Sequence, residues 1–289
     1  MRAGKEITNH TIGEALRDAS CRLAALPQAS PRLEAELLLC DATGFDRTRL
    51  IAWPETAIPD AEMARFQAMV ARRLVGEPIA YIRGRQAFWT LELQVTRQTL
   101  IPRPETELLV ELTLERLPAD APLLVLDAGS GNGAIAAALA CERPVWTLVA
   151  TDRSAAAALV ARENLLRCAP GNTRVVNCDW LAPFAERSLH ALVSNPPYIP
   201  EADPHLDRGD LPYEPRSALA AGPDGLDAIR ALTAQAISRL RPGGLVALEH
   251  GFDQGAAVRS ILAQRGITDT ATHRDLAGHG RATTGLLPG

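Results

Sequence analysis

The stretch Leu123-Leu124-Val125-Leu126-Asp127-Ala128-Gly129-Ser130-Gly131-Asn132-Gly133 decides the fold of the larger part of this chain. Its first four residues are apolar and predict a short buried strand. Three glycines at alternate positions then predict a tight turn, and the apolar run 134–140 predicts a helix directly after it. Such a turn leaves room for a ligand to touch the backbone, and the free N–H groups at the helix start favour an anionic group.

The alternation of strand, turn and helix continues along the chain. Further strands are predicted at 146–150, 174–178, 190–193 and 245–248, and further helices at 154–166 and 224–240. This alternation is typical of a parallel sheet with helices on both faces. We therefore expect an α/β, Rossmann-like domain over residues 105–289.

The preceding residues predict two smaller regions. Residues 1–75 are expected to form a helical unit, with a weak capping box at Thr11–Glu14 and a second helix that begins at Ser30-Pro31. Residues 76–104 are expected to link the two domains. Within them, Phe88–Val95 has the aromatic and alternating pattern of a β-hairpin, and the prolines of Ile101–Pro104 favour an extended connector.

Composition and charge exclude several classes of protein. Hydrophobic residues make up 47% of the 289 residues and charged residues 22%, which is typical of a globular protein. Residues 105–289 carry a net charge of −6, which does not favour binding to a nucleic acid duplex. The longest apolar run is far shorter than a membrane span, and residues 1–6 lead into polar residues, so neither a membrane anchor nor a secretion signal is expected.

Metal binding is not expected either. The five cysteines form no Cys-x-x-Cys pair, and none lies at zinc-ligand spacing from paired histidines. We interpret them as small buried side chains in a reducing cytoplasm.

Acidic side chains follow the second and third predicted strands of the larger domain. Asp152 ends the second strand, 23 residues after Gly129, where a carboxylate can bind a ribose diol. Asp179 and Trp180 end the third strand and suit the amine and the ring of a purine, while Asp127 can orient the turn by accepting backbone N–H bonds. The glycine spacing differs from Gly-x-Gly-x-x-Gly, and no Gly-Lys-Ser/Thr follows, so the pattern favours an adenosine ligand over a dinucleotide or a P-loop phosphate.

The fourth predicted strand runs directly into Asn195-Pro196-Pro197-Tyr198. The two prolines have fixed φ angles and no N–H, and they hold Asn195 extended. The Asn195 side-chain oxygen and the Pro196 carbonyl are therefore two acceptors that suit an –NH₂ group, and Tyr198 can stack on the flat group that carries it. An ordinary turn is the alternative interpretation of these residues.

Together these motifs resemble those of amino-methyltransferases that use S-adenosylmethionine. Further stretches resemble the bacterial release-factor glutamine methyltransferases, the HemK/PrmC family, over nearly the whole chain, although Asn132 and His250 depart from its usual pattern. These stretches are 76–82, Phe88-Trp89, 100–107, 214–216, 225–227 and 275–278.

The resemblance implies a class I methyltransferase sheet, S-adenosylmethionine as cofactor, and methyl transfer to the side-chain amide nitrogen (N5) of the glutamine in the Gly-Gly-Gln motif of class 1 peptide chain release factors. The implied cofactor-binding residues are Asp127, Gly129, Ser130, Gly131, Asn132, Gly133, Asp152, Asp179, Trp180 and Asn195. The implied catalytic residues are Asn195, Pro196, Pro197 and Tyr198, and these bind the substrate together with Arg103, Pro104 and Glu105. Residues 1–75 are expected to dock the release factor, and a cytoplasmic monomer is expected.

Three alternatives stay open on the sequence. The related glutamine methyltransferase of a large-subunit ribosomal protein shares the Asn-Pro-Pro-Tyr motif, as do adenine-amino methyltransferases of DNA or RNA. A module that only senses S-adenosylmethionine is the third, although sensing requires no amine clamp such as the one at Asn195.

Overall fold

A computed structural model describes residues 10–27 and 29–289. The chain divides into two compact units, one ending at Gly84 and one beginning at Arg85. The division falls inside the range 76–104 that the sequence predicts as a linker. The residues interpreted as lacking a secretion signal, 1–6, lie outside the described part. None of the helices in the described ranges is both long and apolar enough to cross a membrane.

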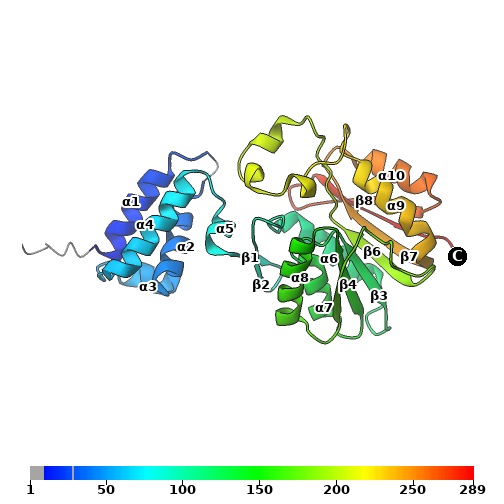
Figure 1. The fold of residues 1–289 in the computed structure, drawn as a ribbon, viewed down its shortest axis with the longest axis horizontal. Helices are drawn as coiled ribbons and strands as arrows, with labels where there is room; N and C mark the ends of the chain where they lie inside the picture. Colours follow the sequence, from blue (N-terminus) through cyan, green and yellow to red (C-terminus); the bar gives the residue numbers. More distant parts are fainter. Residues whose placement is uncertain (1–9, 28) are drawn as a thin grey trace, which may run out of the picture. The chain divides into compact units, whose positions relative to one another are not determined.

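The first unit is helical over its described residues (Figure 1). Its helices are α1 (Ile12–Leu23), α2 (Pro31–Thr43), α3 (Arg47–Ala52), α4 (Asp60–Leu74) and α5 (Ile79–Arg83). The capping box at Thr11 and Glu14 is confirmed, and α2 begins at Pro31 as predicted. Apolar side chains at helical spacing, including Leu16, Leu39 and Phe66, form one buried core.

The second unit begins with the predicted hairpin, β1 (Arg85–Phe88) and β2 (Leu91–Gln94). The turn between the strands places Trp89 at a φ of 55°, and the backbone N–H of Trp89 donates to Glu107 at 2.7 Å. Phe88 and Leu93 are buried in the core of this unit, so the hairpin is part of the larger fold.

A seven-stranded sheet forms the centre of the second unit, with strand order β5-β4-β3-β6-β7-β9-β8. Its strands are β3 (Leu124–Ala128), β4 (Thr147–Asp152), β5 (Thr173–Asn177), β6 (Leu189–Ser194), β7 (Leu240–Glu249), β8 (Thr268–Arg274) and β9 (Gly280–Leu286). The first five strands in the order β5 to β7 are parallel, as predicted, whereas β9 pairs antiparallel with both β7 and β8. The sheet is therefore mostly parallel with an antiparallel edge.

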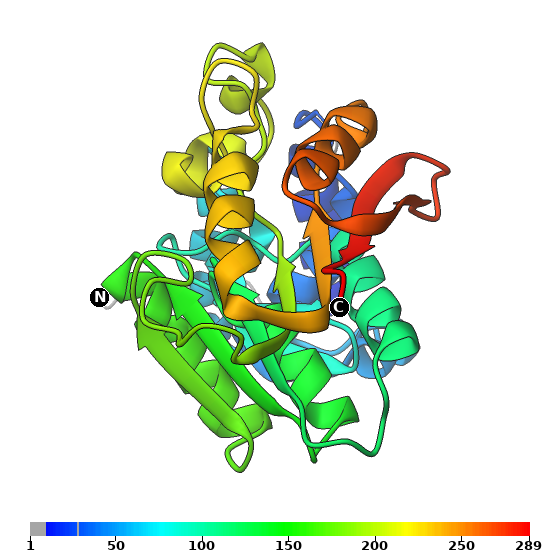
Figure 2. The ribbon, with the colours of Figure 1, turned by 90° about the vertical axis from the view of Figure 1, so that its right-hand side faces the viewer.

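Helices cover both faces of this sheet (Figure 1). They are α6 (Glu107–Arg116), α7 (Ala134–Glu142), α8 (Ala155–Cys168), α9 (Asp227–Arg239) and α10 (Gly255–Gln264). One buried cluster joins α6, α7 and α8 to the sheet, and a second joins α9 and α10 to its other face. Figure 2 shows the β8–β9 pair in red beside α10 in orange. The strand order reverses between β4-β3 and β6, and in open α/β sheets this is where ligands bind.

Candidate active site

A cavity of about 430 Å³ opens at the carboxyl ends of β3, β4 and β6. A volume of this size is within the range of small-molecule sites. The predicted residues that line it are Arg103, Asp127, Gly129, Ser130, Gly131, Asn132, Asp152, Asp179, Trp180, Asn195 and Pro197. The remaining predicted residues, Pro104, Glu105, Gly133, Pro196 and Tyr198, are not among the described lining residues. The structure thus brings both predicted sites to one cavity.

The turn between β3 and α7, which we call the glycine loop (Gly129–Gly133), has a left-handed backbone at each glycine. At Gly129 a Cβ atom would lie 2.9 Å from the indole ring of Trp180, so only glycine lets that ring pack on the loop. At Gly133 a Cβ would lie 3.3 Å from the backbone of Ala161 in α8. Two of the glycines therefore have a packing role in addition to their conformational one.

Asp127 lies beneath the glycine loop and is 1% exposed. One carboxyl oxygen accepts a hydrogen bond from the backbone N–H of Ala136 at 3.0 Å, as predicted for a residue that orients this turn. The other oxygen, and the hydroxyl of Ser130, are buried without a partner among the described residues. Burial raises the pKa of Asp127 to about 7 because it disfavours the charged form.

Asp152 binds the glycine loop directly. Its Oδ2 accepts from the N–H of Gly131 at 3.0 Å, and its Oδ1 accepts from the N–H of Ser154 at 2.8 Å. Burial raises the pKa of Asp152, and the two N–H groups oppose that rise. A carboxylate has about four acceptor sites, so each oxygen retains one for a ligand hydroxyl. The structure therefore gives Asp152 a loop-holding role that the sequence analysis did not predict.

Asn195 is oriented by a segment far away in the sequence. Its Nδ2 donates to the Thr106 hydroxyl at 3.1 Å across a separation of 89 residues, and Thr106 ends the short 3₁₀ helix η1 (Pro104–Thr106). Both residues line the cavity. Because the amide nitrogen is engaged by Thr106, the side-chain oxygen of Asn195 is the group left to accept a hydrogen bond from a ligand.

Tyr198 differs in its contacts from the predicted stacking group. Its hydroxyl donates to Oε1 of Glu249 at 3.2 Å, behind the wall of the cavity. Its carbonyl accepts from Nε2 of Gln254 at 2.9 Å. Burial, and then the Glu249 carboxylate, raise the pKa of Tyr198, so it is a neutral hydrogen-bond donor. Its stacking on a substrate stays a prediction.

Residues 98–100, 102 and 103, which overlap the predicted connector, line another part of the cavity. The buried carboxylate of Glu214 holds this segment in place. Glu214 accepts from the backbone N–H of Ile101 at 3.1 Å and forms an ion pair with Arg103. This contact brings together two separated stretches of the family pattern, 100–107 and 214–216. The side chains of Pro104 and Glu105 are exposed.

The hairpin is joined to the glycine loop by Asn164 of α8. Its Oδ1 accepts from the N–H of Gln94 at 2.8 Å. Its Nδ2 donates to the carbonyls of Gln94 and Asn132, at 2.9 Å each. Asn132 therefore lies where the loop meets β2, and this residue is 3% exposed.

His250, the other departure from the family pattern, is buried, with its ring nitrogens 2.8 Å from the Gly251 carbonyl and from the Thr283 hydroxyl. These contacts are those of a structural residue.

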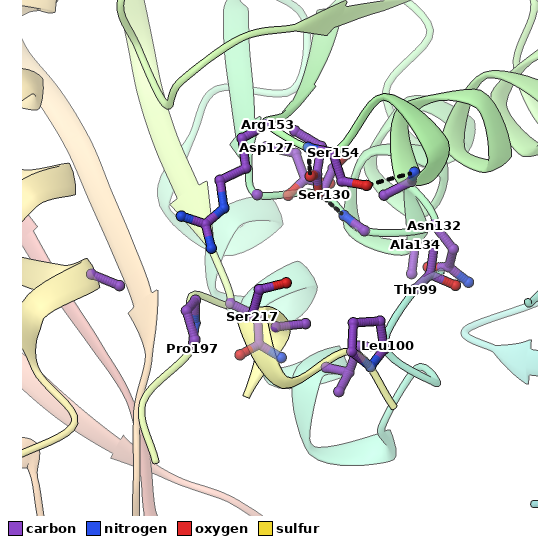
Figure 3. A pocket seen from close by; sticks show the side chains of 18 of the residues that line it. Thr99, Leu100, Asp127, Ser130, Asn132, Ala134, Arg153, Ser154, Pro197 and Ser217 are labelled. Atoms are coloured by element: carbon purple, nitrogen blue, oxygen red, sulfur yellow. Dashed lines mark hydrogen bonds between the residues drawn. The ribbon is translucent and has the colours of Figure 1, made fainter. Parts of the chain in front are cut away.

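Sequence reasoning missed several residues that line the cavity: Phe88, Thr99, Leu100, Thr106, Arg153 and Ser217. Figure 3 shows Asp127, Ser130 and Ser154 gathered on one side, while the Arg153 side chain extends toward Pro197. Arg153 follows Asp152 directly, so its position after a strand end was a usable signal. Phe88 ends β1 of the hairpin and Ser217 lies in the short 3₁₀ helix η4 (Arg216–Ala218), and neither follows a predicted strand of the large sheet.

The cavity fits an adenosine ligand with an amino-acid end. Asp152 retains acceptors for a ribose diol, and Trp180 and Asp179 line the same wall. The buried, unpartnered oxygens of Asp127 and Ser130 are polar atoms that a bound amino-acid group would satisfy. No heavy atom lies within 4 Å of the position that a Cβ atom would take on Gly131, so a ligand can approach the loop backbone there.

Two family models match this chain, one in each of the two compact units that divide at Gly84 and Arg85. Residues 14–84 match the family model described as the PrmC N-terminal domain, and residues 105–207 match the methyltransferase small domain.

Relatives of known function align over almost the entire chain. The release factor glutamine methyltransferase of Pseudomonas aeruginosa is 49% identical, covering 95% of this chain and 98% of its own length. Those of Vibrio cholerae and Escherichia coli are 45% and 43% identical, covering 95% and 93% of this chain and 96% of each relative.

Solved structures share the fold at low identity. A methyltransferase from Pyrococcus furiosus has a TM-score of 0.52 at 19% identity, covering 75% of this chain and 97% of its own. The catalytic domain of hMettl16, solved in complex with the MAT2A 3'UTR hairpin 6, has a TM-score of 0.54 at 15% identity, covering 81% and 84%.

The Rossmann-like sheet, with its glycine loop and cavity, and the matched methyltransferase domain define a methyltransferase. The near full-length identity of 43–49% then fixes the family more narrowly. The chain belongs to the release factor glutamine methyltransferase family.

Proposed function

We propose that this chain transfers a methyl group from S-adenosylmethionine to the side-chain amide nitrogen (N5) of the glutamine in the Gly-Gly-Gln motif of class 1 peptide chain release factors. One observation carries the proposal: the glycine loop and the pair Asn195 and Pro197 line the same cavity. A cofactor held on the loop and an amide held at Asn195 would therefore meet within it. The names of the relatives support the release factor as substrate.

S-adenosylmethionine supplies an electrophilic methyl group on a sulfonium. In the proposed complex, Asp152 accepts from the ribose hydroxyls, and Asp179 and Trp180 hold the adenine. The glycine loop presents backbone N–H groups at the start of α7, while the free oxygens of Asp127 and Ser130 bind the amino-acid end.

The substrate amide is a poor nucleophile because its nitrogen lone pair is delocalised into the carbonyl. The Asn195 side-chain oxygen and the Pro196 carbonyl accept its two hydrogens, which raises electron density on nitrogen and directs it toward the methyl group. Positioning of this kind contributes about 7–11 kcal/mol in well-oriented reactions. The methylated amide loses its extra proton readily, so no carboxylate is assigned as a base.

The release factor itself is much larger than the cavity and requires a docking surface. We assign that role to residues 1–75, with residues 76–104 as the link to the catalytic domain 105–289. Ile51 and Trp53 on this helical unit are 63% and 54% exposed, and we propose that they contact the release factor. At the cavity, Arg103, Pro104 and Glu105 would orient the peptide. Release factors act in translation, so we place the reaction in the cytoplasm.

Methyl transfer from radiolabelled S-adenosylmethionine to a purified class 1 release factor tests this proposal. We expect incorporation into the wild-type factor and none into a factor whose Gly-Gly-Gln glutamine is replaced by alanine. Equal incorporation into both factors would place the methyl group elsewhere and overturn the proposal.

A further inference from the structure

Glu214 is a buried carboxylate between two segments that line the cavity. Its side chain is 0% exposed, and it is not among the described residues that line the cavity. The lining residues that follow it lie within 215–221, and those of the connector segment lie within 98–103. Burying a carboxylate is costly unless its oxygens are paired, so the partners of Glu214 indicate what its burial achieves.

Both oxygens of this carboxylate hold the connector segment. Oε2 accepts from the backbone N–H of Ile101 at 3.1 Å, and Oε1 accepts from the Arg103 guanidinium in an ion pair. An ionised carboxylate only accepts hydrogen bonds, and it accepts at each oxygen, so it satisfies both donors at once. A glutamine side chain has one acceptor oxygen and would turn an –NH₂ group toward one of these donors. The two contacts therefore require an acid at position 214.

The connector segment leads directly to the residue that orients Asn195. The short helix η1 begins immediately after Arg103, and the carbonyl of Arg103 accepts from the backbone N–H of Thr106 at 3.1 Å. The Thr106 hydroxyl then accepts from Nδ2 of Asn195 at 3.1 Å. An ion pair, one short helical turn and a side-chain hydrogen bond therefore lead from Glu214 to the amide of Asn195.

The chain that follows Glu214 is attached to the residue after the Asn195–Tyr198 motif. The backbone N–H of Ile199 donates to the carbonyl of Leu219 at 2.9 Å, and the N–H of Ala221 donates to the carbonyl of Ile199 at 3.0 Å. These two bonds form a parallel bridge between the two segments. Glu214 therefore closes a ring of contacts that begins and ends at the motif.

We propose that Glu214 is a positioning residue for methyl transfer: by holding Ile101 and Arg103, it keeps Thr106 where it orients the Asn195 amide toward the substrate. Glu214 acts through the connector segment and touches no reacting atom. Without its two contacts, Asn195 keeps its place after β6, but its amide loses a fixed partner and is free to turn. The inference deepens the proposed function and rests on it.

A change at Glu214 should affect turnover more than cofactor binding. The groups proposed to hold the cofactor have backbone contacts of their own, such as the bond from the Gly131 N–H to Asp152 at 3.0 Å. The contacts of Glu214 are instead with the segment that carries Thr106. A general loss of structure would weaken both quantities together, so the difference between them separates a positioning role from a merely structural one.

The kinetic test compares E214Q with D275N, a matched loss of a paired carboxylate in the same unit. Asp275 holds the turn between β8 and β9 in a similar way: it accepts from the N–H of Ala277 at 3.0 Å and pairs with Arg281 at 3.3 Å. It is not among the described residues that line the cavity.

We expect kcat with release factor to fall at least tenfold in E214Q, with the cofactor Kd within threefold of wild type. Both quantities should stay within threefold of wild type in D275N. A cofactor affinity that falls as far as kcat in E214Q would make Glu214 a general structural residue and would overturn the inference.

A double variant tests whether the effect passes through Thr106. T106V removes the hydroxyl that accepts from Asn195, so it should lose at least as much kcat as E214Q. The loss in E214Q/T106V should stay within threefold of that in T106V alone, because both changes act on one amide. Losses that multiply would show two separate effects and would also overturn the inference.

The structural test observes the Asn195 side-chain amide directly by NMR. The chain has six asparagines, so labelling with ¹⁵N-asparagine gives few side-chain signals, and N195A assigns the relevant one. We expect this resonance to shift in E214Q and to stay in place in D275N. An unmoved resonance in E214Q, or a kcat within twofold of wild type, overturns the inference.

If E214Q does not fold, E214D takes its place, because it keeps an acceptor-only group that is one methylene too short to reach both donors. The same two outcomes then decide. Failure of the wild-type enzyme to methylate a release factor would refute the proposed function, whereas the resonance in E214Q reports the positioning of Asn195 independently of that substrate.

Discussion

The cavity has two ends in the proposed function: a cofactor end at the glycine loop and Asp152, and an acceptor end at Asn195. The two ends are held in place by different kinds of contact. At the cofactor end, Asp152 accepts from backbone N–H groups a few residues away or in the adjoining turn, such as Gly131. At the acceptor end, Asn195 is oriented by the side chain of Thr106, and nearby Tyr198 donates to Glu249. The residues of the first end were predictable because they follow strand ends, although the contact of Asp152 with Gly131 was not. The second end depends on a side-chain contact that only the tertiary fold creates. The two ends should therefore fail separately when mutated.

The largest expected effect is at the acceptor end. Asn195→Ala removes one of two acceptors for the substrate amide, and turnover should fall about 10²–10³-fold because the lost contact strengthens in the transition state. Cofactor affinity should change by less than about tenfold, since Asp152 and the glycine loop are intact. Single-turnover methyl transfer and a separate cofactor isotherm measure the two quantities. Near wild-type turnover with a collapsed cofactor affinity would mean that the ends are not separate.

Asn195→Asp sharpens the same comparison. The carboxylate still accepts hydrogen bonds but no longer donates to Thr106, so the fixed direction of the group is lost. We expect partial activity, between that of wild type and Asn195→Ala, in the same single-turnover assay. Full activity would show that the contact with Thr106 does not matter.

The next effect is at the cofactor end. Asp152→Ala removes the charge-assisted bonds proposed to the ribose diol, and it removes the acceptor of the Gly131 N–H. Cofactor binding should weaken by about 1.5–3 kcal/mol, roughly ten- to a hundred-and-fifty-fold in Kd. Calorimetry on the wild type, Asp152→Ala and the isosteric Asp152→Asn checks this, with Asp152→Asn expected in between. An unchanged affinity would remove Asp152 from the site.

A smaller effect concerns the free energy of unfolding, to which the buried carboxyl group of Asp127 contributes. Its pKa in the folded protein is raised to about 7, from 3.8, so the unfolded chain releases this proton at lower pH. The contribution of this group to stability is therefore present at low pH and is lost as the pH rises toward 7. Asp127→Asn should gain stability relative to wild type by about 2–3 kcal/mol between pH 5 and pH 8. Urea unfolding at both pH values measures this, and a constant difference would contradict the raised pKa.

The smallest expected effect is on nucleic acid. Residues 105–289 carry a net charge of −6, so duplex affinity at physiological salt should be about 10⁻⁴ M or weaker. A filter-binding salt titration checks it. Tight binding accompanied by methyl incorporation into DNA or rRNA would favour an adenine-amino methyltransferase and would assign the acceptor end to a base.

The fold was predictable where strands are apolar and helices follow them closely. The antiparallel edge of the sheet was not predictable from the sequence, because β8 is largely polar and partly exposed and contains no apolar run. In β9, buried Thr283 and Thr284 are satisfied by hydrogen bonds to His250 and His273, contacts that no sequence pattern announces. The helices α3, α5, α6 and α10 were also not predicted, although α6 carries apolar residues at helical spacing.

The site was predictable only for those residues that directly follow a predicted strand. Residues at strand ends, such as Asp127, Asp152 and Asn195, follow from the rule that parallel strands present their carboxyl ends together. Thr106 and Glu249 do not, because they contact Asn195 and Tyr198 across 89 and 51 residues of sequence.

The central claim is that one cavity brings a cofactor methyl group to a glutamine amide held at Asn195. A competition reaction tests it most directly: the wild-type enzyme is offered a class 1 release factor, large-subunit ribosomal proteins and rRNA together, and mass spectrometry locates the transferred methyl group. The account predicts methylation of the Gly-Gly-Gln glutamine at its side-chain nitrogen, and its loss in Asn195→Ala. Methylation of a ribosomal protein or an RNA base in preference to the release factor would contradict it.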